Sequence, residues 1–148
     1  MSYLIDTNVV LRLQDKDDPH HEQCTSAMEL IRNSGESLLI CAQVLAEFWV
    51  VSTRPREANG WGLAFDDAVI EIGKVRATFR CLAEPPDMAD RWQQVVIDNK
   101  TMGKPAYDAR LVAMMVAHGV KRIVTLNVGD FARYSGITAA TPQEILNR

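Results

Sequence analysis

Short apolar runs alternate with longer amphipathic segments along the 148 residues of the chain. Residues 3–5, 38–41, 79–82 and 122–126 are continuously or mostly apolar, which is typical of strands buried on both faces of a parallel sheet. Between these runs, apolar residues recur every three or four positions, and this period predicts helices. A last strand and a short terminal helix are expected in the tail from residue 137.

The predicted helices are Val9–Leu13, His20–Arg32, Ala42–Thr53, Asp66–Ala77, Met88–Ile97 and Ala106–His118. Stop signals support two of their ends, because Pro55 follows the third helix and Gly119 follows the sixth. Strands that alternate with helices in this way predict an α/β fold with a parallel sheet covered on both faces. The length and the lack of a linker or internal repeat favour a single domain over residues 1–148.

Composition narrows the possible functions only slightly. The formal net charge of −3 counts against a passive nucleic-acid binder, which usually has a basic surface. It does not exclude a nuclease, because carboxylates at a metal site make the count more negative. No apolar run approaches the ~20 residues of a membrane span, so a cytoplasmic location without a membrane is expected. Three widely spaced cysteines favour free thiols over disulfides or a zinc site.

Four acidic residues stand directly beside apolar segments, where a carboxylate is unfavourable. Asp6 ends the first apolar run, Glu47 interrupts the third predicted helix, and Asp108 lies near the start of the sixth. Asp130 closely follows the fourth apolar run. Because a buried unpaired carboxylate is costly, such groups usually pair, accept hydrogen bonds or hold a cation. Several of them at the ends of core elements suggest a divalent metal held by oxygen atoms.

The four acids are expected at one edge of the sheet. In an open α/β sheet, ligands bind beyond the carboxyl ends of the strands, where the strand order reverses. Asp6 and Asp130 follow strands, whereas Glu47 and Asp108 lie near the amino ends of helices that face the same edge. Ordinary alternatives remain for each acid. Asp6 and Asp130 could be caps, Asp108 a first-turn acid, and Glu47 an exposed helix residue.

Four segments, taken in order, resemble the PIN-domain family, and within it the VapC-type ribonuclease toxins of bacterial toxin–antitoxin pairs. The matching segments are Leu4–Leu11 (LIDTNVVL), Val44–Phe48 (VLAEF), Tyr107–Ala113 (YDARLVA) and Val124–Phe131 (VTLNVGDF). Each segment alone is a weak signal, but four at these intervals are fairly specific and span essentially the whole chain. The resemblance implies a three-layer α/β/α sandwich with a central, mainly parallel sheet.

The resemblance also implies Mg²⁺- or Mn²⁺-dependent endonucleolytic cleavage of RNA, in which a metal-activated water hydrolyses a phosphodiester. Asp6, Glu47 and Asp108 match the acidic metal-site positions of the family. In the last matching segment, Asp130 is favoured as direct or water-mediated support for the metal, and Asn127 is the alternative. The number of metal ions and the RNA target stay open.

Polar and basic neighbours are predicted to support the ion and bind RNA. The expected supporting residues are Thr7, Asn8, Thr125 and Asn127. The expected RNA contacts are Arg54, Arg56, Lys104 and Arg110, from loops or helix ends near the predicted edge. Ordinary solvated charge is the alternative for each of these basic residues. Trp61 is expected either to stack on an unpaired base or to pack against protein.

The family further implies a homodimer and a small antitoxin protein that covers the active site. The groove between residues 9–13 and 20–32 is the predicted antitoxin surface, with a helix docked in it. Other interpretations are a non-catalytic PIN-like binding module, a response-regulator-like module, and a different metal-dependent phosphatase or DNA nuclease. The segment 79–82 lacks the terminal acceptor aspartate that a response regulator requires.

Overall fold

The structure, a computed structural model, describes all 148 residues and contains one five-stranded sheet. The strands are β1 (Ser2–Ile5), β2 (Ser37–Cys41), β3 (Arg80–Leu82), β4 (Arg122–Val124) and β5 (Thr138–Ala140). Their order is β3-β2-β1-β4-β5, and all four neighbouring pairs are parallel. The predicted parallel sheet is therefore confirmed, and it has no antiparallel member.

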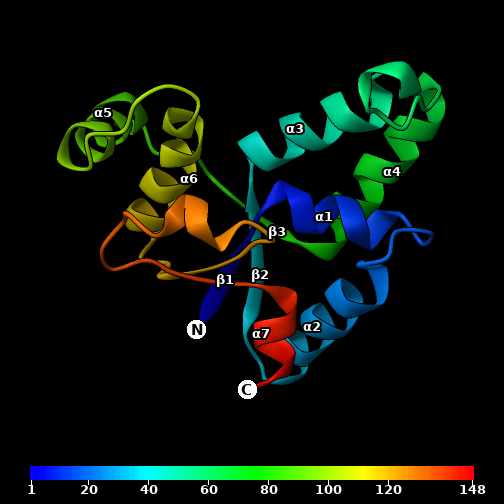
Figure 1. Cartoon of the computed structure of the whole chain (residues 1–148), viewed down its shortest axis with the longest axis horizontal. Coiled ribbons are helices and arrows are strands. Elements are labelled where there is room, and N and C mark those ends of the chain that lie inside the picture. The colour runs from blue at the N-terminus through cyan, green and yellow to red at the C-terminus, as the bar shows by residue number, and fades with distance from the viewer.

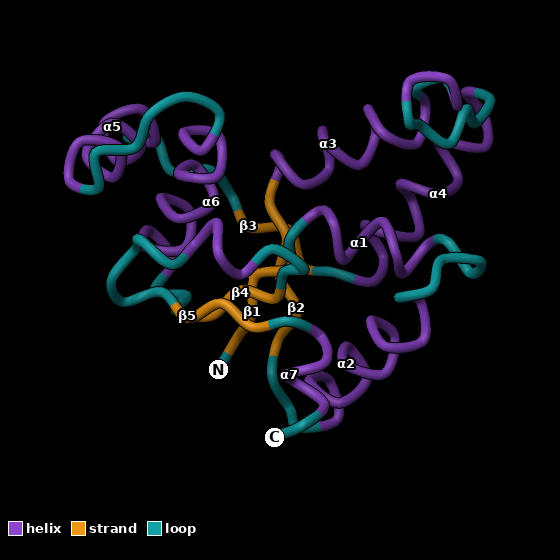
Figure 2. The backbone as a smooth tube through the Cα atoms, in the orientation of Figure 1, coloured by secondary structure: helices purple, strands orange, loops and turns teal.

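Helices cover both faces of the sheet, which confirms the three-layer α/β/α sandwich. They are α1 (Thr7–Gln14), α2 (His21–Asn33), α3 (Ala42–Thr53), α4 (Phe65–Thr78), α5 (Met88–Asp98), α6 (Pro105–His118) and α7 (Pro142–Leu146). Figure 1 shows α5 and α6 on one side of the strands and α1, α2 and α7 on the other. Helices α3 and α4 extend outward beyond α1, as the tube in Figure 2 also shows.

Local hydrogen bonds move two element boundaries away from those that the apolar pattern predicts. Helix α1 begins at Thr7, two residues early, because the Asp6 carboxylate accepts a hydrogen bond from the Thr7 backbone N–H and caps the helix. Strand β4 ends at Val124 because the backbone N–H of Leu126 donates to the Asn8 side chain and not to a strand. Two short 3₁₀ turns, η1 (Arg56–Ala58) and η2 (Val128–Phe131), were not predicted.

A single cluster of 33 buried hydrophobic residues fills the space between the layers. Strand β1 and helix α6 lie deepest in it, as their continuously apolar sequences predicted. All three cysteines are free thiols, and two of them are buried in the core. No helix combines the length and apolar character that crossing a bilayer requires.

The strand order creates one reversal point, between β1 and β4. From β1 the chain continues to β2 on one side, whereas from β4 it continues to β5 on the other. A crevice at the carboxyl ends of these two strands is the usual ligand site of an open parallel sheet. The order also differs from the 2-1-3-4-5 arrangement of response regulators, and this excludes the response-regulator-like alternative.

Candidate active site

A cleft of about 560 Å³ opens at the carboxyl ends of β1 and β4. The predicted acids Asp6, Glu47, Asp108 and Asp130 all line it, together with Asn127. They come from the end of β1, from α3, from α6 and from η2. The structure therefore brings the four predicted carboxylates and the predicted amide into one place.

Asp6 is the most buried of the acids, at 8% exposure. One carboxylate oxygen, Oδ1, accepts from the Thr7 backbone N–H at 2.7 Å, and Oδ2 accepts from the Thr125 hydroxyl at 2.8 Å. Burial raises the pKa of Asp6 above its ordinary value, while these two hydrogen bonds oppose the rise. The carboxylate is thus held in one orientation at the floor of the cleft.

Asn8 connects the ends of the two central strands. Its amide nitrogen donates to the Thr125 hydroxyl at 3.2 Å and, more weakly, to Asp6 Oδ2 at 3.4 Å. Its amide oxygen accepts from the backbone N–H of Leu126 at 3.1 Å. Asn8 and Thr125, both predicted as supporting residues, therefore act on the cleft by fixing Asp6.

Glu47 is held by two donors from different helices. Its Oε2 accepts from the Thr7 hydroxyl at 2.8 Å, and its Oε1 accepts from the Gln43 amide nitrogen at 2.9 Å. The same nitrogen donates to the carbonyl oxygen of Tyr107 at 3.1 Å, next to Asp108. Gln43 was not predicted as a site residue, although its position four residues before Glu47 on one helix face was a usable signal.

The pKa of Asp108 reflects both its burial and the negative charge of the other acids in the cleft. Burial raises its pKa to about 6, and the negative charges of Asp6, Asp130 and Glu47 push it in the same direction. Asp130 itself is exposed and accepts no hydrogen bond from another side chain, so it is the least fixed of the four acids. The cleft carries more negative charge than the chain compensates.

Arg54 is the only basic residue that lines the cleft, and it forms no ion pair with the acids. Its guanidinium donates to the carbonyl oxygen of Asn59 at 3.0 Å. No three acidic, histidine or cysteine side chains are close enough to share one ion as direct ligands. This donor set fits Mg²⁺ or Mn²⁺, since a hard cation can bind through one or two carboxylates and keep several waters. It does not fit a closed zinc site.

The other predicted RNA contacts separate into two groups. Lys104 and Arg110 line a second pocket, which adjoins the cleft along α6. Arg56 does not face the acids, because η1 directs it toward Trp61, whose carbonyl oxygen it contacts at 3.4 Å. Trp61 packs edge-on against buried Phe48, with ring centroids 5.7 Å apart. Arg56 therefore lies in a different pocket from the acids, its contact with RNA stays a prediction, and Trp61 is a packing residue.

The surface between the first two helices, which was predicted to bind the antitoxin, stays a prediction. Helices α1 and α2 pack directly on each other, and α2 is further covered by α7. Met28 of α2 is 4% exposed and belongs to the core. The buried apolar residues of α1 and α2 pack against other parts of the chain.

Comparisons with known proteins agree with this geometry. Residues 3–137 match the PIN domain family. Ribonuclease VapC24 of Mycobacterium tuberculosis is 28% identical, over 88% of this chain and 89% of the relative. Among solved structures, VapBC2 from Rickettsia felis bound to a promoter DNA fragment superposes with a TM-score of 0.72 at 14% identity, covering 95% of this chain and 98% of that one. The sarcin-ricin loop cleaving toxin VapC20 of M. tuberculosis superposes with a TM-score of 0.57 at 17% identity, covering 82% and 86%.

Proposed function

The chain belongs to the PIN-domain family, and from this premise we propose that it is a Mg²⁺- or Mn²⁺-dependent endoribonuclease and the toxin of a toxin–antitoxin pair. The substrate would be an RNA phosphodiester, hydrolysed by an activated water. Similarity to a VapC ribonuclease over most of both chains supports this substrate class.

One observation carries the proposal: carboxylates from three separate core elements meet at the reversal point of the sheet without a compensating cation. Glu47 follows Asp6 by more than 40 residues, and Asp108 follows Glu47 by more than 60, yet all three line the same cleft. A structural role would pair these charges within the chain, because unpaired buried carboxylates cost stability. A binding role leaves them for a cation.

The chain's own residues have separable tasks in this reaction. Asp6, Glu47 and Asp108 would hold the ion, at most two of them directly and the rest through its bound waters, with Asp130 and Asn127 at the outer side of the cleft. When bound, Mg²⁺ or Mn²⁺ supplies charge stabilisation at the phosphoryl group and a water of lowered pKa. Thr7 and Thr125 keep two of the carboxylates oriented. Arg54 adds the one positive charge that can attract a phosphate into an acidic cleft.

The antitoxin partner is placed differently from the sequence prediction. VapBC complexes are among the solved structures that superpose on this chain, which supports a protein partner. Exposed apolar side chains lie on α3 and α4, where Val50, Phe65 and Ile70 are each more than half exposed. We place the antitoxin across this face, next to the acidic cleft, and a homodimer remains a prediction.

The test is cleavage of purified cellular RNA and of defined oligomers, with 5′ and 3′ ends mapped by sequencing. We expect cleavage with Mg²⁺ or Mn²⁺, none with a chelator, and none by Asp6→Asn in any buffer. Asp17→Asn serves as the matched control, since this exposed acid lies in the loop between α1 and α2, outside the cleft.

Two results would count against the proposal. Equal cleavage by Asp6→Asn and wild type would show that the acids are not the catalytic centre. Absence of cleavage, with no Mn²⁺ bound in a calorimetric titration, would favour the non-catalytic binding module.

A further inference from the structure

A second pocket of about 860 Å³ lies between α5 and α6, beside the acidic cleft. Its wall carries two aromatic residues, Trp92 and Tyr107, and the apolar side chain of Met88. The indole nitrogen of Trp92 donates to the carbonyl oxygen of Ala106 at 2.7 Å, so this ring is fixed against α6. The volume is within the range of small-ligand sites, about 300–1,000 Å³.

The Gln43 side chain connects the pocket with the cleft. The amide nitrogen of Gln43 lies 2.9 Å from the Glu47 carboxylate and 3.1 Å from the carbonyl oxygen of Tyr107. These two contacts place the Tyr107 carbonyl within about 6 Å of a proposed metal-binding carboxylate. Tyr107 and Asp108 are also consecutive on α6, with Tyr107 lining the pocket and Asp108 lining the cleft.

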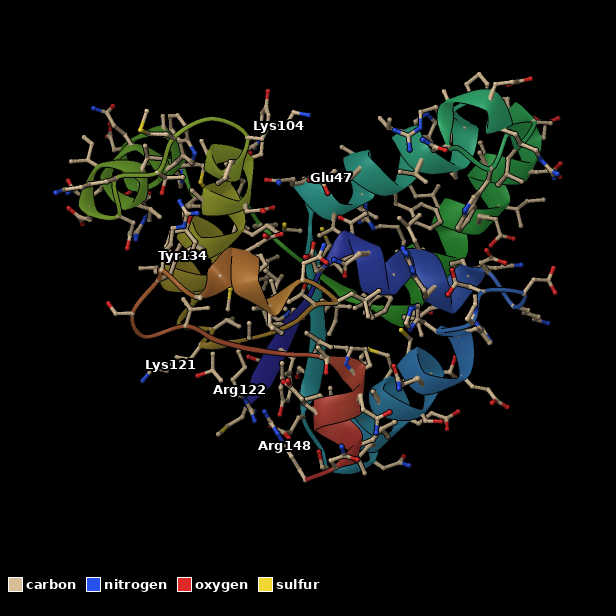
Figure 3. All side chains as sticks on the ribbon, in the orientation of Figure 1. Glu47, Lys104, Lys121, Arg122, Tyr134 and Arg148 are labelled. Atoms are coloured by element: carbon tan, nitrogen blue, oxygen red, sulfur yellow. The ribbon has the colours of Figure 1, made fainter.

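Charge on this side of the molecule suits a polyanion. Lys104, at the start of α6, lines the pocket and forms no ion pair. Figure 3 shows Lys104 and Glu47 at the ends of α6 and α3 that face each other. Arg110 also lines the pocket, and its exposed ion pair with Glu84 at 3.1 Å is of a kind that water readily competes with.

We propose that this pocket binds one unpaired nucleobase of the RNA, next to the scissile phosphodiester, with the base stacked on Tyr107. The proposal rests on the proposed ribonuclease function. Lys104 would neutralise a backbone phosphate between the pocket and the cleft. The site then selects substrates in which the nucleotide beside the cleavage position can leave a helix.

The chemistry favours a base over a protein side chain as the occupant. Sequence-tolerant binding of single strands combines aromatic stacking surfaces with cations that follow the backbone. Tyr107 is 69% exposed, which leaves its ring open for stacking, while Lys104 remains uncompensated. An apolar protein partner would leave that ammonium group without a counter-charge.

Fluorescence of 2-aminopurine tests the stacking directly, with the probe placed singly at each position of an intact RNA oligomer that the wild type is able to cleave. The assay uses Asp6→Asn protein in a metal-free buffer, so that the RNA is not cleaved during the measurement. We expect quenching at one position beside the cleavage site, lost in Tyr107→Leu. Phe65→Leu is the matched control, because Phe65 is also 69% exposed but lies on α4, and it should retain the quenching.

Cleavage kinetics with Mg²⁺ provide a second readout. Removing the base at that one position should lower kcat/KM of the wild type by about 5- to 150-fold, as expected for loss of one stacked base. Tyr107→Leu should lose the same factor on the intact RNA and be insensitive to the abasic change.

Salt dependence separates the contribution of Lys104. Lys104→Gln should reduce the slope of log Kd against log salt by about 0.7, as expected for one contact with a single-stranded phosphate. Lys121→Gln is the control, because Lys121 lies far from Lys104 at the other end of the molecule (Figure 3) and should leave the slope unchanged.

Each negative result has a distinct meaning. Cleavage of RNA with no quenched position, or with equal quenching in Tyr107→Leu and wild type, overturns the pocket and leaves the ribonuclease proposal intact. A change of oligomeric state in Tyr107→Leu with unchanged RNA binding would assign this surface to a protein partner and also overturn it. Absence of cleavage by the wild type overturns the ribonuclease proposal and, with it, the placement of a base beside a scissile bond, so this outcome is distinct from failure of the pocket alone.

Discussion

The charged side chains are unpaired at one end of the central strands β1 and β4 and paired at the other. At the carboxyl ends, four acids face one arginine that forms no ion pair with them. At the amino ends, Arg122 pairs with Glu36, lies over the Tyr3 ring at 3.8 Å from its centroid, and donates to the Tyr3 hydroxyl. Arg148 donates to the same hydroxyl at 2.8 Å, and Figure 3 shows Arg122 and Arg148 close together.

The pKa shifts express this contrast. A hydrogen bond from Arg122 lowers the pKa of Glu36 below its ordinary value, whereas burial among other acids raises the pKa of Asp108 to about 6. The amino-end cluster satisfies its charges within the chain and stabilises the fold. The carboxyl-end cleft retains a net negative charge that no ion pair within the chain neutralises. Whether the charges are paired, and not how many there are, therefore distinguishes the structural end from the candidate functional end.

The largest expected effect comes from neutralising one acid at each end. Glu47→Gln should lower the rate of RNA cleavage by about 1000-fold, because the site loses part of its charge for the ion. Glu36→Gln should change the rate less than twofold. Rates measured at saturating Mg²⁺ with circular dichroism as a folding check decide this, and similar losses in both variants would remove the functional contrast.

Arg122→Ala should cost about 2 kcal/mol of unfolding free energy, since it removes an ion pair, a cation–π contact and a hydrogen bond together. Arg110→Ala is the matched control, because the side chains of Arg110 and Glu84 are 44% and 46% exposed, against 20% and 23% for Arg122 and Glu36. The control should cost less than about 0.5 kcal/mol. Urea denaturation measures both, and equal losses would contradict a stabilising role for the amino-end cluster.

Thr7→Val tests whether orientation of Glu47 matters. The change removes the hydroxyl that donates to Glu47 Oε2 at 2.8 Å while keeping the shape of a buried side chain. Mn²⁺ affinity measured by calorimetry should fall about tenfold, as is usual when a hydrogen bond to a metal ligand is lost. Thr53→Val, whose hydroxyl bonds only to a backbone carbonyl in α3, should keep the wild-type affinity.

The smallest effect is a dependence of stability on pH in the metal-free protein. Because the pKa of Asp108 rises from 3.8 to about 6 on folding, its favourable contribution is complete below pH 4 and is lost as the pH rises through 6. Stability should therefore fall by about 1 kcal/mol between pH 5 and pH 7.5, after allowance for solvent screening at a partly exposed group.

Asp108→Asn should remove this slope, and so should saturating Mg²⁺ in the wild type. Glu36 has the opposite effect. Its lowered pKa contributes stability that is complete above pH 4.5 and is lost only as the pH falls below that value. Thermal melts across the range separate the two groups. A slope that persists in Asp108→Asn would assign it to another residue.

Much of the fold and three acids of the site were predictable because they depend on local periodicity and on ends of elements. Strand β1 and helix α6 are apolar along their whole buried length, so their period and the adjacent Asp6 and Asp108 stand out. Glu47 was visible because it interrupts an apolar helix. The sheet order then places all three at one edge.

The remaining site residues depend on how segments meet in space. Gln43 resembles an ordinary surface amide until α6 brings the Tyr107 carbonyl to it. The position of Arg56 was not predictable because Gly60 lets the loop fold tightly onto the Arg54 backbone, where an added Cβ would lie 1.9 Å from the Arg54 carbonyl oxygen. The direct packing of α1 on α2 likewise depends on the tertiary structure and could not be deduced from either segment alone.

Asp6 ends the first strand, caps α1 and faces the cleft with one carboxyl group. Asparagine is as good an N-cap as aspartate and has the same shape, so Asp6→Asn removes a charge while preserving the start of the helix. One carboxyl group thus serves the fold and the cleft at once, and this exchange separates its two tasks: the helix start is kept while the charge at the floor of the cleft is lost.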